Sequence, residues 1–419
     1  MKSTRWRSVP LRRLGSLVGG GTPTADEANW GGVIPFVTPS DLRPVVGGVV
    51  GATERSLTED GAVSGSSVVP AGSVILSIRA PIGYVARTDR TAALNQGCRA
   101  IVPFDGTSAK YLTYTLMAAG GELASLGRGT TFMELSTPQM AGLELPTPPL
   151  EEQRVIADYL DHETARIDTL IAEQQTLVEM LRERRHALRV EGAVRGMDDA
   201  PLVSSLLPWA KRVPAHWQVV PLTSVAQLES GHTPSRTCDD WWRDCYIPWI
   251  SLNDVGAMRA SKYITDTAHQ LSDEGVANSS ARVLPAGTVV LSRDATVGRT
   301  AIMGVPMATS QHFADWICGP CLDPEYLWLL FSDAMQTHFD SFQNGSTIRT
   351  IGMGDLKAFR IPLPPFDEQR RIVEHVDAQT ARIDVLTVET ERLIELARER
   401  RSALITAAVT GQIDVREAT

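Results

Sequence analysis

Residues 147–171 read TPPLEEQRVIADYLDHETARIDTLI, and residues 363–387 read LPPFDEQRRIVEHVDAQTARIDVLT. The Pro-Pro pair, Glu-Gln-Arg and Thr-Ala-Arg-Ile-Asp recur in the same register, 216 residues apart. Proline at the start, followed by acidic residues in the first turn, is typical of a helix N-terminus, because the helix dipole favours negative charge there. Each stretch therefore predicts the start of a long helix.

The large apolar residues of both helices are spaced alternately by three and four positions, which is the pattern of a coiled-coil seam. Such a stripe cannot be buried by one helix alone. We expect the two helices to pair with each other as an antiparallel coiled coil of roughly 60 Å, the arrangement that a two-fold axis across them requires. The alternative is that each helix packs only on its neighbouring globular domain. The predicted seam comprises Ile156, Leu160, Ile167, Leu170, Leu177, Leu181 and Leu188, then Ile372, Val376, Ile383, Leu386, Leu393, Ala397 and Leu404, with polar positions at Glu163 and Gln379, Gln174 and Thr390, and Arg184 and Arg400.

The repeat extends over nearly the whole chain. VPLRRLGSLVGGGTP from Val9 resembles VPLTSVAQLESGHTP from Val220, and VVPAGSVILSIRAPIG from Val68 resembles VLPAGTVVLSRDATVG from Val283. Short β-type runs that follow Pro-Ala-Gly turns favour mixed α/β (α+β) globular parts. We predict a pseudo-two-fold internal repeat of globular domains at 1–148 and 196–364, helices at 149–195 and 365–411, and a tail at 412–419.

Composition excludes several classes of protein. The chain of 419 residues has a net charge of −9, so it is no polycation that binds nucleic acid without local sites. Its five cysteines are too few for a disulfide scaffold. Long apolar runs of membrane-spanning length are lacking, and the first residues lack the apolar core of a signal peptide, so we expect a cytoplasmic protein.

This layout resembles the specificity (S) subunit of type I restriction–modification enzymes. The resemblance is carried by the PTPPLEEQ and PLPPFDEQ junctions, by the helix segments RERRHAL and RERRSAL, and by the closing ITAAVTGQI from Ile405. It implies two target recognition domains that read the two halves of an asymmetric, bipartite site on double-stranded DNA. It also implies two modification methyltransferase subunits docked on the helices, and restriction (motor and nuclease) subunits. S-adenosylmethionine, ATP and Mg²⁺ would then belong to these partners, and this chain would hold no cofactor.

Base readout requires polar side chains on exposed loops. The alternative for each candidate is a solvated loop or a turn cap. The candidates are Thr38, Ser40, Asp41, Arg43, Arg79, Asn95, Gln96, Arg128, Thr130 and Thr131 in the first repeat, and Ser251, Asn253, Asp254, Arg293, Asp294, Ser310, Gln311, His312, Ser346, Thr347 and Arg349 in the second.

Motifs for catalysis are absent from the sequence. There is no methyltransferase motif, no phosphate-binding loop and no glycine-rich cofactor turn, so we expect a non-catalytic chain. Asp355-Leu-Lys357 faintly resembles a nuclease motif, which keeps a nuclease as a remote alternative. Whether Cys238, Cys245, Cys318 and Cys321 hold zinc stays open.

The helices carry more apolar surface than one mate requires, which predicts a surface that binds two copies of one partner. The alternative is that the excess packs on the nearby globular domain. A scaffold that binds only proteins is the main rival to the DNA-reading function. The predicted partner-binding residues are Arg154, Val155, Tyr159, Ile171, Val178, Arg370, Leu393 and Ile394.

Overall fold

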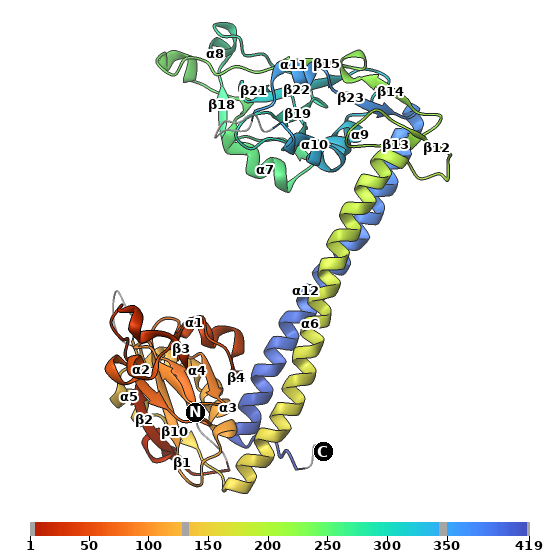
Figure 1. The fold of residues 1–419 in the computed structure, drawn as a ribbon. Coiled ribbons are helices and arrows are strands. Elements are labelled where there is room, and N and C mark those ends of the chain that lie inside the picture. The colour runs from red at the N-terminus through yellow and green to blue at the C-terminus, as the bar shows by residue number, and fades with distance from the viewer. Residues whose placement is uncertain (1–4, 128–133, 343–349, 417–419) are drawn as a thin grey trace. The chain divides into compact units, whose positions relative to one another are not determined.

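The computed structural model describes residues 5–127, 134–342 and 350–416 (Figure 1). The chain forms two compact units. Unit 1 comprises Met1–Gln175 with Glu391–Thr419, and unit 2 comprises Thr176–Thr390. Each unit therefore contains one globular domain and one half of each long helix.

Unit 1 is built on two sheets, with strand orders β2-β10-β7-β8-β4 and β5-β3-β9-β6, and a small β1-β11 pair. Its core lies between the five-stranded sheet and α3, where Val74, Leu76, Leu112 and Leu116 are fully or almost fully buried. The elements are β1 Ser8–Pro10, β2 Gly15–Gly19, β3 Trp30–Val37, α1 Pro39–Leu42, β4 Val49–Val50, β5 Ser56–Leu57, α2 Glu59–Gly65, β6 Ser67–Val69, β7 Val74–Ser77, β8 Val85–Thr88, β9 Ala92–Leu94, β10 Cys98–Pro103, α3 Ala109–Ala118, α4 Gly120–Leu126, α5 Thr137–Gly142 and β11 Glu144–Pro146.

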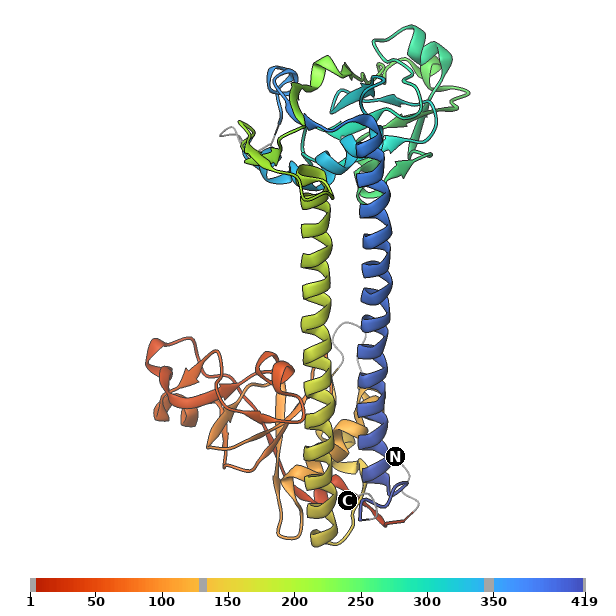
Figure 2. The same cartoon turned by 90° about the vertical axis from the view of Figure 1, so that its right-hand side faces the viewer.

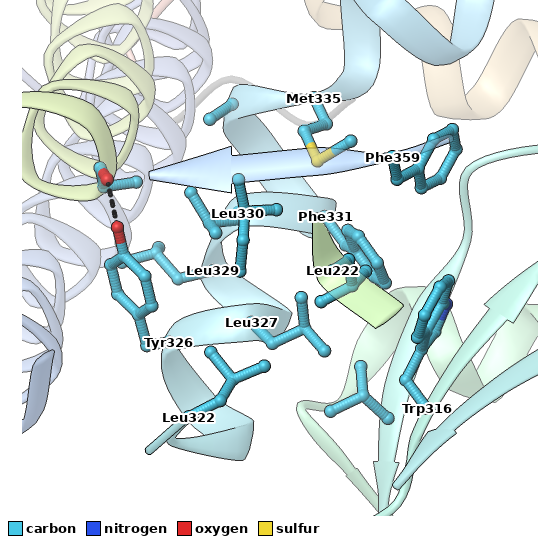
Figure 3. Packing of buried hydrophobic residues seen from close by; sticks show 14 of the residues in the cluster. Leu222, Trp316, Leu322, Tyr326, Leu327, Leu329, Leu330, Phe331, Met335 and Phe359 are labelled. Atoms are coloured by element: carbon cyan, nitrogen blue, oxygen red, sulfur yellow. Dashed lines mark hydrogen bonds between the residues drawn. The ribbon is translucent and has the colours of Figure 1, made fainter. Parts of the chain in front are cut away.

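Unit 2 repeats this plan, with sheets β15-β22-β19-β20-β17 and β18-β16-β21 and the pairs β14-β23 and β12-β13. In the core of unit 2, Trp316, Leu330 and Phe331 are fully buried and pack with Phe359 (Figure 3). The elements are β12 Leu202–Ser204, β13 Arg212–Pro214, β14 Gln218–Pro221, β15 Ala226–Ser230, β16 Ile247–Ile250, α7 Val255–Ala260, β17 Tyr263–Ile264, β18 His269–Leu271, α8 Asp273–Ala277, β19 Val289–Ser292, β20 Thr300–Met303, β21 Ala308–Thr309, β22 Phe313–Cys318, α9 Pro324–Leu329, a π-helical turn Leu330–Ala334, α10 Gln336–Asp340, α11 Met353–Lys357 and β23 Arg360–Leu363.

A buried tyrosine ties each globular domain to its helices. The Tyr111 hydroxyl on α3 donates to the carbonyls of Pro146 and Val409 at 3.1 and 3.2 Å. On α9, the Tyr326 hydroxyl is placed in the same way and lies 2.9 Å from the carbonyl of Ala193, the contact drawn in Figure 3. Burial raises the pKa of both hydroxyls, so both stay protonated donors.

The long helices are α6, Leu150–Arg195, and α12, Phe366–Thr410 (Figure 2). In unit 1, Arg401 pairs with Asp168 at 2.8 Å, and in unit 2 Arg185 pairs with Asp384 at 2.7 Å. In each unit, early residues of one helix therefore meet late residues of the other. The predicted antiparallel pairing and internal repeat are confirmed.

At several positions of the predicted seam, the residue that is buried is the one that follows the predicted residue. Leu170, Leu386 and Leu393 are 38 %, 49 % and 42 % exposed, whereas Val178 and Ile394 are buried. The same shift applies to the predicted polar seam positions: the residue that follows each of them is less exposed. These positions are Glu163, Gln379, Arg184 and Arg400. Positions confirmed as buried are Ile156, Leu160, Ile167, Ile372, Val376, Ile383, Thr390 and Ala397.

Threonines account for part of this shift of register. The hydroxyls of Thr164 and Thr380 donate to the carbonyls four residues earlier, at 2.6 and 2.8 Å. With its hydroxyl satisfied by its own helix, a threonine can bury its methyl group like an apolar residue. The seam therefore runs through Thr164 and Thr380, which an apolar count passes over.

Asp315 on β22 is a fully buried carboxylic acid that corresponds to Ala100 in the first repeat. Burial raises its pKa to about 7, although the hydrogen bond that the Thr309 hydroxyl donates at 2.5 Å lowers the pKa. The folded chain therefore binds the proton more tightly than the unfolded chain does. This contribution to stability is complete when the pH is below 3.8, the ordinary pKa of aspartic acid, and is lost as the pH rises towards 7.

We expect Asp315→Asn to remove this pH dependence. Between pH 5 and pH 8, the parent should lose at least about 1 kcal/mol more of its free energy of unfolding than the variant does. Thermal unfolding measured at both pH values tests this. Parallel pH profiles of the two proteins would show that Asp315 does not titrate in this range.

Candidate nucleic-acid interface

A threonine–glutamine pair lies at the same place in both units. In unit 1, the loop after β2 brings the hydroxyl of Thr22 into a hydrogen bond with the Gln96 side-chain oxygen, and Asn95 Nδ2 donates to that hydroxyl at 3.1 Å. In unit 2, Thr233 after β15 donates to Gln311 Oε1 at 2.6 Å. Adjacent antiparallel strands create both pairs, because β2 ends where β10 begins, and β15 ends where β22 begins.

These pairs present amides at the surface. Gln96 and Gln311 are exposed, and Gln311 Nε2 lies 3.5 Å from His312 Nε2. Glutamine can bond two atoms of an adenine edge in the major groove, so a glutamine held by its oxygen on a loop suits base readout. Sequence reasoning selected both glutamines but missed Thr22 and Thr233, although the repeated Thr-Pro after a glycine-containing turn was a signal for them.

The loops after β7 and β19 lie beside the segments that lead to the long helices. Arg79 pairs with Glu134 at 3.2 Å, and Asp294 forms a backbone bridge with Thr350. His312 Nδ1 lies 3.2 Å from Asp294 Oδ2, with Arg293 Nε 4.0 Å from the same oxygen. The candidates Arg128, Thr130, Thr131, Ser346, Thr347 and Arg349 lie outside the described residues.

Several candidates cap short helices. Asp41 accepts from the backbone N–H of Thr38 at 2.8 Å and from that of Glu54 at 3.0 Å. Asp254 does the same for Ser251 and Ala268, at 2.8 and 2.7 Å.

Burial decides which of these candidates are accessible. Ser251, Asp254 and Ser310 are buried, so the expectation of exposed loop side chains is wrong for these three. Ser40, Arg43 and Asn253 are exposed, and Asn253 lies 3.0 Å from His269.

The other chemical candidates show ordinary roles. Asp355 accepts from the backbone N–H of Gly352 at 3.3 Å and caps α11. All cysteines are unpaired, and burial raises the pKa of Cys318 to about 12. Within 5–127, 134–342 and 350–416, no three His, Cys, Asp or Glu side chains are grouped to hold a metal ion.

Some of the predicted partner-binding residues are buried and others are exposed to solvent. Val178 and Ile394 belong to the seam, and Tyr159 packs in a cluster with Tyr111 and Tyr114. Ile171 is half-buried. The exposed members are Arg154, which pairs with Glu151 at 2.7 Å, and Val155, Arg370 and Leu393.

Exposed apolar residues line the outside of the helix pair in both units. Leu170 and Leu386 are equivalent in the repeat, and each lies beside a seam position. The helix residues of this kind are Val155, Leu170, Leu393 and Leu396 in unit 1, and Met180, Phe366, Val385, Leu386 and Val388 in unit 2.

The chain contains two copies of a mixed α/β domain. Each copy lies on an antiparallel helix pair and has its own polar loop cluster, which defines a protein with two recognition sites.

The chain belongs to the family whose model is described as type I restriction modification DNA specificity domain, which matches residues 4–180 and 214–396. No helix in the described part of the chain is long and apolar enough to cross a membrane.

Relatives cover the chain from end to end. It is 24 % identical to the type I restriction enzyme MjaIX specificity subunit of Methanocaldococcus jannaschii, over 98 % of this chain and 94 % of that protein. It is also 24 % identical to the MjaVIII specificity subunit of the same organism, over 73 % and 70 %.

Two solved structures share the fold. A chain from a study of complex assembly and conformational transition of the type I R-M system matches with a TM-score of 0.75 and 18 % identity, over 99 % of this chain and 100 % of that one. The HsdS subunit of Thermoanaerobacter tengcongensis matches with a TM-score of 0.59 and 18 % identity, over 98 % of each. The predicted resemblance is therefore confirmed.

Proposed function

We propose that this chain is the DNA-specificity subunit of a type I restriction–modification complex, and that each unit reads one half of a bipartite site. The observation that carries the proposal is the threonine–glutamine pair, placed identically in both units within loops that otherwise differ. Asn95 precedes Gln96, whereas Ser310 precedes Gln311, and Gly97 is replaced by His312.

The difference between the loops favours an asymmetric site. Two identical readers related by a two-fold axis would recognise an inverted repeat. Here the threonine–glutamine pair repeats but the side chains around it differ, so each unit recognises its own bases.

The helices supply the surface for partners. Exposed apolar side chains at equivalent positions in both units suit two copies of one partner. On this proposal the partners are two modification methyltransferase subunits, joined by restriction subunits in the cytoplasm. This chain is then non-catalytic, and S-adenosylmethionine, ATP and Mg²⁺ act on the partner subunits.

Substitution of the two glutamines tests the reading of DNA. Gln96→Ala is expected to weaken binding of the cognate site and to relax preference in one half of it only, while Gln311→Ala acts on the other half. The loss should be about 1–3 kcal/mol per variant, the value of a bidentate base contact. Binding of the complex to a library of DNA sites, followed by sequencing, measures both effects.

Gln227→Ala, which changes an exposed glutamine on β15, is the matched control and should leave both halves unchanged. Relaxed preference in both halves by one variant would contradict independent readers. A complex with no sequence preference at all would favour a protein-binding scaffold.

A further inference from the structure

A cleft of about 470 Å³ lies within unit 2, where the globular domain meets the helices. It is lined by residues of α7, of the loop before β20, of α9 and the π-helical turn, and of both long helices. Five cationic residues and three acidic residues line it, in a chain that is acidic overall. They are Arg185, Arg189, Arg259, Lys262 and Arg299, and Asp333, Asp377 and Asp384.

Each acid in the cleft already has a cation. Asp384 pairs with Arg185 at 2.7 Å, and Asp333 pairs with Arg189 at 2.8 Å. Asp377 is bound by the ammonium group of Lys262.

Two arginines remain. The guanidinium groups of Arg259 and Arg299 have no hydrogen-bond or ion-pair partner among the described residues. The lining residues therefore sum to a net charge of +2, and Glu325, outside the lining, shares the ammonium group of Lys262 at 2.8 Å.

Two buried donors lie in the same wall. Thr300 at the start of β20 is 4 % exposed, and its hydroxyl has no hydrogen-bond partner. The indole Nε1 of Trp328 on α9 is also buried without a partner. A buried polar group without a partner destabilises a fold, so two of them beside two unpaired arginines point to a missing acceptor.

We propose that this cleft binds a phosphate group. Two guanidiniums, a hydroxyl and an indole N–H offer donors to more oxygens than a carboxylate has, and the planar fork of arginine matches phosphate geometry. The phosphate comes either from the backbone of bound DNA, which would extend the function proposed above, or from a free phosphate-bearing molecule.

The equivalent cleft of unit 1 provides a contrast. It is lined by Arg43, Asp168, Arg398 and Arg401, with several apolar residues. Val85 corresponds to Thr300 there and is fully buried. The unpartnered hydroxyl of Thr300 is thus specific to unit 2, and Arg398→Ala, at the cleft of unit 1, is the matched control.

The first arm of the test uses the full-length chain and inorganic pyrophosphate. Calorimetric titration should show binding that Arg259→Ala with Arg299→Ala weakens by about tenfold or more. Thr300→Val, which copies unit 1, should weaken it less, and Arg398→Ala should not change it. Thermal unfolding without ligand shows that the variants are folded.

The second arm measures DNA binding against salt concentration. If the phosphate belongs to DNA, the double variant should lower the slope of log K on log salt by about 0.9 for each lost contact, equally on cognate and random DNA. An unchanged slope with lost pyrophosphate binding assigns the site to a free ligand. No pyrophosphate binding and an unchanged slope would overturn the proposal, whereas loss of sequence preference in the parent protein would refute only the reading function.

Discussion

On the function proposed above, Leu386→Glu is expected to reduce the bound methyltransferase from two copies to one, and Leu170→Glu is expected to remove the other copy. Both leucines are exposed on the helix pair, at equivalent positions in unit 2 and unit 1. A glutamate at a covered interface would bury an unpaired charge, which costs several kcal/mol. Native mass spectrometry of the assembled complex counts the copies, and the double variant should bind none.

The matched control is Val63→Glu on α2, which is 85 % exposed and lies away from the helices. It should keep two methyltransferase copies. Two copies bound at ordinary affinity in Leu386→Glu would place the partner on another surface. Loss of the thermal transition in that variant would show instead that Leu386 serves the fold.

Asp333→Ala is expected to lower the free energy of unfolding of unit 2 by about 3–5 kcal/mol, because it leaves a buried charge without its partner. The side chain of Arg189 is only 6 % exposed and donates to Asp333 at 2.8 Å and to the Ser332 hydroxyl at 3.1 Å. Its guanidinium also lies 4.8 Å from the ring centre of Trp328. Urea unfolding followed by tryptophan fluorescence measures the loss.

Unit 1 suggests how to rescue this variant. Ile405 in unit 1 stands where Arg189 stands in unit 2, and it is buried among apolar residues, with Met117 and Ala118 packed against that cluster. Asp333→Ala with Arg189→Ile should therefore recover most of the lost stability. A double variant as unstable as the single one would show that the cost arises from lost packing and not from the unpaired charge.

The repeated helices show how far local patterns reach. Pro-Pro with acidic neighbours places the start of α6 and α12 correctly, because these signals act through the first turn alone. The choice of seam residues was wrong at Glu163 and Gln379 and at Leu170, Leu386 and Leu393, since it depends on which side chains face the other helix. A threonine that bonds its own helix counts as apolar there, and a spacing rule applied to large apolar residues cannot recognise it.

The loops show a similar division. The sequence indicates that polar residues follow the strands, but it does not indicate that Thr22 meets Gln96 or that Asp41 caps a helix. These contacts join residues far apart in the chain or depend on local turn geometry.

By itself, the sequence determined the internal repeat, the two long helices, the mixed α/β class and the resemblance to specificity subunits, because repetition and periodicity are properties of the chain order. Only the tertiary structure decided that each unit is completed by the distant half of the other helix, that Arg185 meets Asp384, and that Arg259 and Arg299 remain unpaired beside Thr300. The reason is physical: burial, pairing and unsatisfied donors are relations between residues that meet in space, and antiparallel helices bring together residues about 200 positions apart.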